Sequence, residues 1–136
     1  MRFKFLEHTA DIKFQAFAPT LEELFKNSAS AMFGSMHDGK IKSAIKKKIK
    51  VKGKDKESLL YNFLEELLFL FDSEGFFPAK FSKIKIDKKK LILEAEILGD
   101  NSKNYEIHLD VKAVTYNEMF VKKEKNKWVA QVVVDV

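Results

Sequence analysis

Residues 12–33 of the chain read IKFQAFAPTLEELFKNSASAMF, and this stretch decides the fold class. Its first seven residues carry an apolar side chain at every second position, which is the period of a half-buried β-strand. Pro19 ends the strand, and Thr20 and Glu23 have the spacing of a capping box at the start of a helix. A helix that ends near Met36 follows, with small and apolar side chains three or four residues apart. Its buried stripe consists of Leu21, Leu24, Phe25, Ser28, Ala29, Met32 and Phe33.

The same two periods recur on either side of this stretch. Residues 2–6 predict a short strand, and residues 45–52 alternate lysine with apolar side chains, as a half-exposed strand does. The lysines of that strand could touch phosphate or could keep a sheet edge from pairing with another molecule. Asp55 caps a second helix that Gly75 ends, and the wide apolar face of this helix predicts that it lies deep in the protein. Further strands are expected over residues 80–87, 90–98, 105–116, 119–124 and 127–135.

These elements predict a single α+β domain over residues 1–136, with a large, mainly antiparallel sheet and two α-helices. Hydrophobic residues make up 46% of the chain and include thirteen Phe, which is enough for a core. The absence of Cys excludes a thiolate metal site and a cysteine nucleophile, and it favours a reducing compartment. No apolar run is long enough to cross a membrane, and the N-terminus lacks the apolar region of a signal peptide. We therefore expect a cytoplasmic protein without a membrane partner.

The charge of the chain is mildly positive. Lys and Arg together number 25 against 20 Asp and Glu, which gives a formal net charge of +5. Such a balance favours an acidic or nucleic-acid-bearing partner. Arg2 is the only Arg, however, so forked phosphate contacts are few, and most lysines are expected on the wet face of a sheet.

Two aspartates near the ends of the chain are the main candidates for chemistry. If strand pairing brings Asp11 and Asp135 together, their carboxylates and the terminal carboxylate of Val136 could hold a hard divalent cation. The alternative is two solvated aspartates at strand ends. His8 could bind the metal, orient a carboxylate or cap a turn. The sequence has no Ser-His-Asp order, phosphate-binding glycine loop or zinc-type histidine spacing, so we expect no catalytic set of its own.

The predicted strand over residues 105–116 presents a varied polar face. The period of a strand places its polar side chains on one side and its apolar side chains on the other. This polar face either is simply exposed or lines a site, and alternation alone favours exposure. Its members are Glu106, His108, Asp110, Lys112 and Tyr116.

Five blocks of the sequence, in this order, resemble the archease family. The similarity runs from Phe3 to the last residue. Asn117 stands where many members have His, and residues 99–104 form a shorter connection than is usual there. The blocks are HTADI at 8–12, TLEELF at 20–25, LLYNFLEELL at 59–68, VKAVTY at 111–116 and DV at 135–136.

The resemblance implies a cytoplasmic, non-enzymatic protein that activates an RtcB-type RNA ligase in tRNA splicing. Such an activator promotes guanylylation of the ligase from GTP and its multiple turnover, with GTP bound by the ligase and tRNA reached through the ligase. The family's metal ligands correspond to Asp11 and Asp135, and its important lysine corresponds to Lys112. The cation is expected to be calcium, with magnesium or manganese as alternatives, and Val136 and His8 are further candidate ligands.

Two other functions are compatible with the sequence. The family has also been considered a chaperone-like modulator of a tRNA-modifying methyltransferase, and the basic surface and exposed strands permit this role. A direct RNA-binding module is the third hypothesis. The single Arg and the lack of interleaved aromatic and basic residues stand against it.

Overall fold

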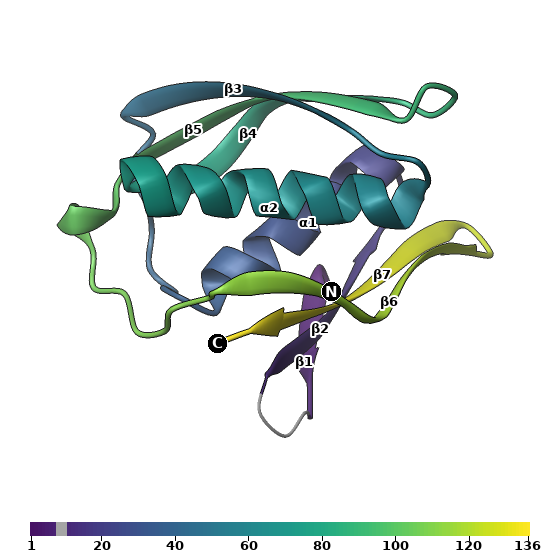
Figure 1. Cartoon of the computed structure of the whole chain (residues 1–136), viewed down its shortest axis with the longest axis horizontal. Coiled ribbons are helices and arrows are strands. Elements are labelled where there is room, and N and C mark those ends of the chain that lie inside the picture. The colour runs from purple at the N-terminus through teal and green to yellow at the C-terminus, as the bar shows by residue number, and fades with distance from the viewer. Residues whose placement is uncertain (8–10) are drawn as a thin grey trace.

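Two antiparallel sheets enclose a layer of two helices in this protein (Figure 1). The coordinates are those of a computed structural model, and the structure describes residues 1–7 and 11–136. One sheet has four strands in the order β1-β2-β7-β6, and the other has three in the order β3-β5-β4. The strands of the first sheet are β1 (Phe3–Leu6), β2 (Ile12–Ala18), β6 (Ala113–Glu124) and β7 (Lys127–Asp135). Those of the second are β3 (Ile45–Lys52), β4 (Phe76–Asp87) and β5 (Ile92–Asn101).

The α+β class with two helices is confirmed, but the prediction of one large sheet is wrong. Helix α1 (Leu21–Gly34) contacts β2 and β7 on one side and β4 on the other. Helix α2 (Lys56–Glu74) likewise contacts β6 and the three strands of the second sheet. A helix that is apolar over most of its circumference needs cover on two sides. The wide apolar face of α2 is therefore explained by two sheets, one above and one below the helix layer.

Both helices begin at the residues that the sequence indicates. Thr20 caps α1, where its Oγ1 accepts a hydrogen bond of 3.2 Å from the Glu23 N–H. Asp55 and Ser58 form a reciprocal capping box at the start of α2, with bonds of 2.7 and 3.1 Å. Gly75 ends α2 in the left-handed conformation at φ 67°, which glycine adopts without strain.

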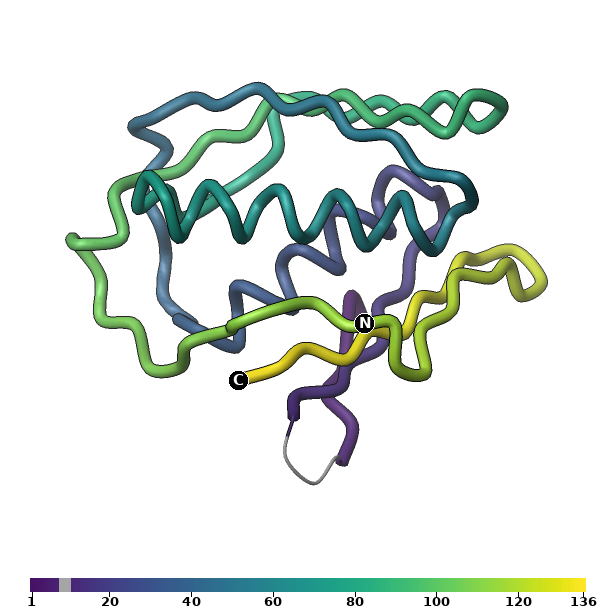
Figure 2. Tube along the Cα trace, viewed as in Figure 1, coloured from purple at the N-terminus to yellow at the C-terminus, as the bar shows by residue number. Residues whose placement is uncertain are grey.

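The prediction of a strand over residues 105–116 is wrong for residues 105–112. These residues follow a short 3-10 helix, η1 (Ser102–Asn104), and cross from the three-stranded sheet to the four-stranded one (Figure 2). Their side chains still alternate between buried or half-buried and exposed, which is the pattern that suggested a strand. The main-chain N–H of His108 donates a hydrogen bond to the carbonyl oxygen of Met36, and that of Lys112 donates one to the carbonyl oxygen of Asp135. Alternating burial of side chains indicates that a segment contacts the core on one side. A β-strand also requires hydrogen bonds to a neighbouring strand.

Strand β6 also differs from expectation, because it joins the last residues of the strand predicted over 105–116 to the strand predicted over 119–124. It runs from Ala113 to Glu124 and contains an irregularity in its pairing with β7 between Thr115 and Phe120. Glu118 within that irregularity has a φ of 53°. A β-bulge of this kind bends the strand and re-aims its side chains.

A single cluster of buried side chains fills the space between the two sheets. Its largest members include Phe14 of β2, Phe25 of α1, Phe63 of α2 and Phe76 of β4. The rings of Phe25 and Phe63 lie 5.6 Å apart, so they join the two helices across the centre of the layer. Among the described residues, neither helix has the length and apolar character needed to span a membrane.

Candidate functional site

The register of the four-stranded sheet brings Asp11 and Asp135 together at one end of that sheet. Ile12, the first residue of β2, pairs with Val134 of β7. Asp11 directly precedes β2, and extending this register by one residue puts it opposite Asp135, which pairs on its other side with Ala113 of β6. Directly opposed residues of antiparallel strands project to the same face, with Cβ atoms about 5 Å apart. The observed pairing of β2 with β7 ends at Ile12 and Val134, so the joining of the two aspartates stays a prediction that this register permits.

The two aspartates belong to the outer face of the sheet. The next row, formed by Ile12, Val134 and Val114, faces the core, and Val134 is fully buried. Because side chains alternate along a strand, the row that contains Asp11 and Asp135 faces away from the core. Asp11 is half-buried and Asp135 is exposed, so a solvent ion or a partner protein can reach this row.

Lys13 is a basic neighbour of this pair that the sequence analysis did not single out. It lies two residues beyond Asp11 on the same face, and its Nζ is 3.1 Å from Glu118 Oε1. Glu118 reaches it from the bulge of β6, and the main-chain oxygen of Glu118 accepts a 2.7 Å hydrogen bond from Gln131 Nε2. No sequence pattern signals this contact, because it depends on the bulge between Thr115 and Phe120. The ammonium of Lys13 is therefore paired with the carboxylate of Glu118.

Lys112 is attached to the same end of the sheet through its main chain. Its N–H donates a 2.8 Å hydrogen bond to the Asp135 carbonyl oxygen, and its side chain is exposed. Lys112 itself directly precedes β6, whose pairing with β7 starts at Ala113 and Asp135. The Val136 side chain is a hydrocarbon that packs against the core, and its main-chain oxygens are the atoms that could serve as ligands. The predicted lysine is thus joined through its main chain to the segment that carries Asp135.

The described part of the chain supplies two carboxylates to this site. His8, a candidate ligand, lies outside the described residues. Among residues 1–7 and 11–136, no group of three or more His, Asp or Glu is arranged to hold a metal ion. Carboxylate oxygens are the donors that Ca²⁺, Mg²⁺ and Mn²⁺ prefer, so Asp11 and Asp135 fit a hard cation chemically. Ca²⁺ takes six to eight oxygens, so two carboxylates provide a partial site.

Helix α2 fixes the position of β6 through two carboxylates that accept hydrogen bonds from the strand. Glu65 Oε2 accepts a 2.7 Å bond from the Val114 N–H, and Glu57 Oε2 accepts a 3.0 Å bond from the Val121 N–H. Strand β6 is an edge of its sheet, so these N–H groups would otherwise lack a partner from a neighbouring strand. Glu65 thereby anchors the strand one residue after Ala113, next to the candidate site.

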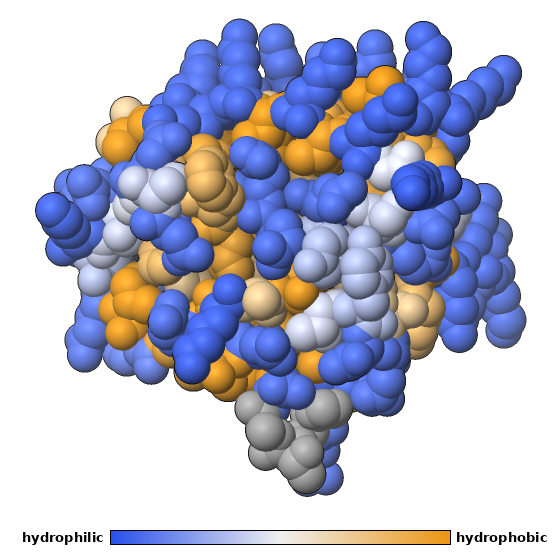
Figure 3. All heavy atoms as spheres, viewed as in Figure 1, coloured by the Kyte–Doolittle hydropathy of each residue, from blue (hydrophilic) through white to orange (hydrophobic). Residues whose placement is uncertain are grey.

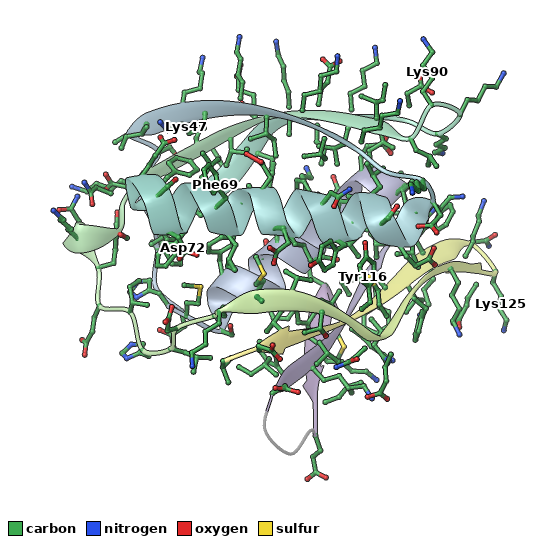
Figure 4. All side chains as sticks on the ribbon, in the orientation of Figure 1. Lys47, Phe69, Asp72, Lys90, Tyr116 and Lys125 are labelled. Atoms are coloured by element: carbon green, nitrogen blue, oxygen red, sulfur yellow. The ribbon has the colours of Figure 1, made fainter. Side chains whose placement is uncertain are left out.

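Between these two anchors, Tyr61 of α2 stacks on Tyr116 of β6. The ring centroids are 4.1 Å apart and the ring planes differ by 10°. Figure 4 shows Tyr116 beneath α2, on the side of the four-stranded sheet. Burial, followed by the nearby Tyr61 and Asp55, raises the pKa of the Tyr116 hydroxyl. The three side chains of α2 that contact β6 are four residues apart, at Glu57, Tyr61 and Glu65. Residues with this spacing lie on one face of a helix, so the sequence places all three on the same side of α2.

His108 belongs to a different cluster from the aspartates. Its ring is stacked on that of His37, with the ring centroids 6.3 Å apart and an interplanar angle of 8°. Its main-chain N–H donates a hydrogen bond to the Met36 carbonyl oxygen. His37 Nδ1 lies 2.7 Å from the Glu106 carbonyl oxygen. Four residues separate His108 from Lys112, which is about 13 Å of extended chain. These contacts assign His108 a role in holding the 105–112 segment against the end of α1.

Asp110 lies near the last turns of α2. Burial, and then the negative charge of Asp110, raise the pKa of Asp72 on that helix. Figure 4 shows Asp72 on the side of α2 that faces the 105–112 segment. The polar side chains that a strand pattern places on one shared face therefore contact different parts of the protein.

The fold and the site define a small α+β protein with two antiparallel sheets around two helices and paired aspartates at one sheet end. Residues 3–136 match the model of the Archease protein family (MTH1598/TM1083). The archease of Methanosarcina barkeri is 39% identical over 99% of this chain and 96% of its own length. That of Pyrococcus furiosus is 41% identical over 96% and 95%. The chain belongs to the archease family, as the five sequence blocks indicated.

Solved structures show the same architecture. The solution structure of protein 1598 of Methanobacterium thermoautotrophicum is 36% identical, has a TM-score of 0.84 and aligns over 99% of both chains. A crystal structure from Thermotoga maritima, described as an archease and possible chaperone, is 20% identical. Its TM-score is 0.68 over 98% of this chain and 96% of that one, and at this identity it supports the fold alone.

Proposed function

We propose that this protein is a metal-dependent activator of an RtcB-type RNA ligase, promoting guanylylation of the ligase and its multiple turnover. The observation that carries the proposal is the register that sets Asp11 opposite Asp135 on an exposed sheet end. The Lys112 main chain is hydrogen-bonded to Asp135 at the same place. Accessible carboxylates at the end of a rigid sheet, with the main chain of an exposed lysine attached to it, suit insertion into the cleft of another protein.

The chemistry of guanylylation fits this set of groups. Transfer of a guanylyl group from GTP to an imidazole develops negative charge on the phosphoryl oxygens, and fixed positive charges stabilise it. Asp11 and Asp135 would hold a divalent cation, with calcium as the first candidate and magnesium or manganese as the alternatives. When bound, the cation would supply positive charge to this surface. Lys112 would contribute a permanent positive charge beside it, while GTP and tRNA would be bound by the ligase.

Because the metal site of the isolated protein is partial, we expect the ligase to supply some of the missing ligands. The described residues offer two carboxylates, whereas Ca²⁺ requires more oxygen ligands. The remaining ligands would come from the main-chain oxygens of Val136, from water, from His8 or from the ligase. The affinity for the metal should therefore be low in the isolated protein and higher in its complex with the ligase. If both proteins contribute ligands to one ion, binding of the ligase raises the affinity for the ion, and the ion raises the affinity for the ligase.

The test is a reconstituted ligation reaction with purified ligase, GTP and RNA ends, with and without this protein. We expect faster multiple turnover and more guanylylated ligase when the protein is present. Asp11→Asn and Asp135→Asn should each lower the stimulation about tenfold or more, whereas Asp38→Asn, at an exposed position of the 37–40 turn, should not. No stimulation by the unmodified protein contradicts the activator role, and full stimulation by both aspartate variants contradicts the metal mechanism alone.

The alternative function is a chaperone-like modulator of a tRNA-modifying methyltransferase. It is favoured by two large apolar side chains at the surface, since Phe5 is 49% exposed and Phe69 is 60% exposed. This function predicts that the protein increases the solubility of the modifying enzyme and that Asp11→Asn leaves the effect unchanged. A solubility assay of that enzyme with each protein variant separates the two functions.

A further inference from the structure

The outer face of the three-stranded sheet carries an ordered array of lysines. Its central strand, β5, presents Glu94 and Glu96, and each of them is flanked by one lysine on β3 and one on β4. Lys47 does not belong to this array, because it pairs with Glu74 of α2 on the inner side. The rows across the sheet are Lys50–Glu94–Lys85 and Lys48–Glu96–Lys83, and Lys46 and Lys52 extend the β3 column at its ends.

The hairpin between β4 and β5 extends this array beyond the end of the sheet. Its three consecutive lysines, residues 88–90, are all exposed. Asp87 Oδ1 accepts 3.0 Å hydrogen bonds from the N–H groups of Lys89 and Lys90, which fix the turn and lower the pKa of Asp87. Lys90 projects away from the protein in Figure 4. We call the following nine residues the lysine face: Lys46, Lys48, Lys50, Lys52, Lys83, Lys85, Lys88, Lys89 and Lys90.

The net positive charge of the protein is concentrated on this face. Nine lysines stand against three carboxylates, those of Asp87, Glu94 and Glu96, which leaves six positive charges in excess. The formal net charge of the whole chain is +5, so the remainder of the protein is close to neutral. Figure 3 shows hydrophilic side chains covering the upper margin of the molecule, over the three-stranded sheet. A concentrated field of one sign attracts a ligand with many charges of the opposite sign.

The glutamates of β5 leave the lysines available to such a ligand. Lys46 Nζ is 3.7 Å from Glu96, and Lys50 Nζ is 4.0 Å from Glu94. Both lysine side chains are more than half exposed, at 57% and 68%. Exposed ion pairs of this length contribute little free energy, so their lysines can exchange one anionic partner for another.

The geometry of the face fits a regular polyanion. Lysines at alternate positions of one strand are about 6.7 Å apart, and the columns on β3 and β4, two strand spacings apart, are separated by about 9.6 Å. Two parallel columns of cations on one sheet match a ligand that presents two lines of phosphates. The outward positions that define the rows on β3, β4 and β5 hold no aromatic side chain for stacking on bases. Recognition of single-stranded RNA commonly uses such stacking, so this surface suits contact with a phosphate backbone instead.

We propose that the lysine face binds the phosphate backbone of double-helical RNA, independently of its sequence. The choice of RNA over DNA rests on the proposed function, whereas the contact with two lines of phosphate rests on the geometry of the face. Edge protection is the competing explanation, since β3 and β4 are both edge strands and lysines on edges prevent pairing with other molecules. Edge protection requires no ligand, and a binding measurement therefore separates the two explanations.

The experiment measures binding of the isolated protein, without ligase, to a fluorescently labelled RNA duplex over a range of salt concentrations. The test variant replaces four lysines of the face, and the control variant replaces four lysines of the β6–β7 hairpin, whose turn residue Lys125 is labelled in Figure 4. Both variants change the net charge by the same amount. The test substitutions are Lys48→Gln, Lys50→Gln, Lys83→Gln and Lys85→Gln, and the control substitutions are Lys122→Gln, Lys123→Gln, Lys125→Gln and Lys127→Gln. Thermal melting establishes that both variants are folded.

We expect salt-sensitive binding that weakens about tenfold or more in the test variant and about twofold or less in the control. The slope of log K against log salt should become shallower by about one for each phosphate that the test variant no longer neutralises. The proposal is overturned by an absence of binding, or by equal weakening in the two variants. Tighter binding to a DNA duplex, to single-stranded RNA or to anionic lipid vesicles also overturns it. Because no ligase is present, these outcomes are independent of the test of the activator role.

Discussion

Tyr61 of α2 and Tyr116 of β6 are stacked with their ring centroids 4.1 Å apart, and this contact connects the buried helix to the strand that carries the candidate site. The stack lies between two hydrogen bonds from β6 to the same helix, one to Glu57 and one to Glu65. Three side chains of α2 therefore replace the missing neighbour of this edge strand. The position of Ala113, which pairs with Asp135, depends on these contacts.

The first prediction concerns this stack. Replacing Tyr61 by Ala removes a stacked aromatic pair, which contributes about 1 kcal/mol beyond its buried area. We expect the melting temperature to fall by about 4 °C or more, since this is the shift that 1 kcal/mol produces in a chain of this size. Tyr61→Phe retains the ring and should remain within about 1 °C of the unmodified protein. Equal melting temperatures for the Ala and Phe variants would show that the stack contributes nothing.

The second prediction concerns the anchor at the start of β6. Glu65→Leu leaves the N–H of the buried Val114 without its acceptor, and an unsatisfied group of this kind lowers stability by about 1–3 kcal/mol. It should also reduce stimulation of the ligase, because the strand end next to Asp135 loses its attachment. Glu65→Gln keeps an oxygen acceptor at the same position and serves as the control.

Chemical denaturation gives the stability of each Glu65 variant, and the ligation assay gives its activity. We expect the Leu variant to lose both and the Gln variant to retain most of both. Reduced stability in the Leu variant with undiminished stimulation would separate this anchor from the function of the site.

The sequence was sufficient to predict the strand that begins at Ile12, both helix starts and the placement of the strands that precede Asp135 and follow Asp11 next to each other. Each of these depends on local periodicity or on which strands are neighbours near the chain ends. The division into two sheets was not predictable in this way, because alternation does not identify the partner of a strand. Residues 105–112 show the same limitation, since they alternate along the core without a neighbouring strand.

Part of the candidate site was also beyond prediction from the sequence. Lys13 contacts Glu118 only because a bulge in β6 displaces residues between Thr115 and Phe120. A bulge depends on how two strands fit together over their whole length, and no single residue signals it here. His108, in contrast, was a candidate by residue type, and the structure assigns it to the stack with His37.

The third prediction concerns the pH dependence of stability at the end of β5. Asp100 is 7% exposed, and its carboxylate accepts hydrogen bonds from the Tyr105 hydroxyl at 2.7 Å and the Asn101 N–H at 2.8 Å. These bonds, with that of Tyr105 as the largest contribution, lower the pKa of Asp100. A carboxyl whose pKa is lower in the folded than in the unfolded state stabilises the fold fully above the unfolded value, near pH 4. That stabilisation is lost as the pH falls through the folded value.

We expect Asp100→Asn to be less stable than the unmodified protein at pH 7, with the difference narrowing below about pH 4. Each oxygen of the Asp100 carboxylate accepts one of these hydrogen bonds. The side-chain amide of Asn has only one oxygen, and its nitrogen cannot accept, so the contact with Tyr105 is weakened. Thermal melting from pH 7 to pH 2.5 measures the difference. Asp38→Asn is the control for a change of one negative charge. A constant difference between Asp100→Asn and the unmodified protein across this range would contradict the assignment.

The fourth prediction concerns the metal at the sheet end. Mn²⁺ is paramagnetic and broadens the NMR signals of nearby nuclei, and it accepts the same oxygen ligands as Ca²⁺. Substoichiometric Mn²⁺ should broaden the amide signals of residues 11–13, 112–114 and 133–136 before those of the lysine face, and excess EDTA should restore them. Asp135→Asn removes one of the two carboxylates and should shift the broadening to at least tenfold higher Mn²⁺, whereas Glu124→Gln, at the far end of β6, should leave it unchanged. Broadening that begins at Asp72 and Asp110, or that survives in Asp135→Asn, would place the cation elsewhere and leave the sheet end without a role in binding it.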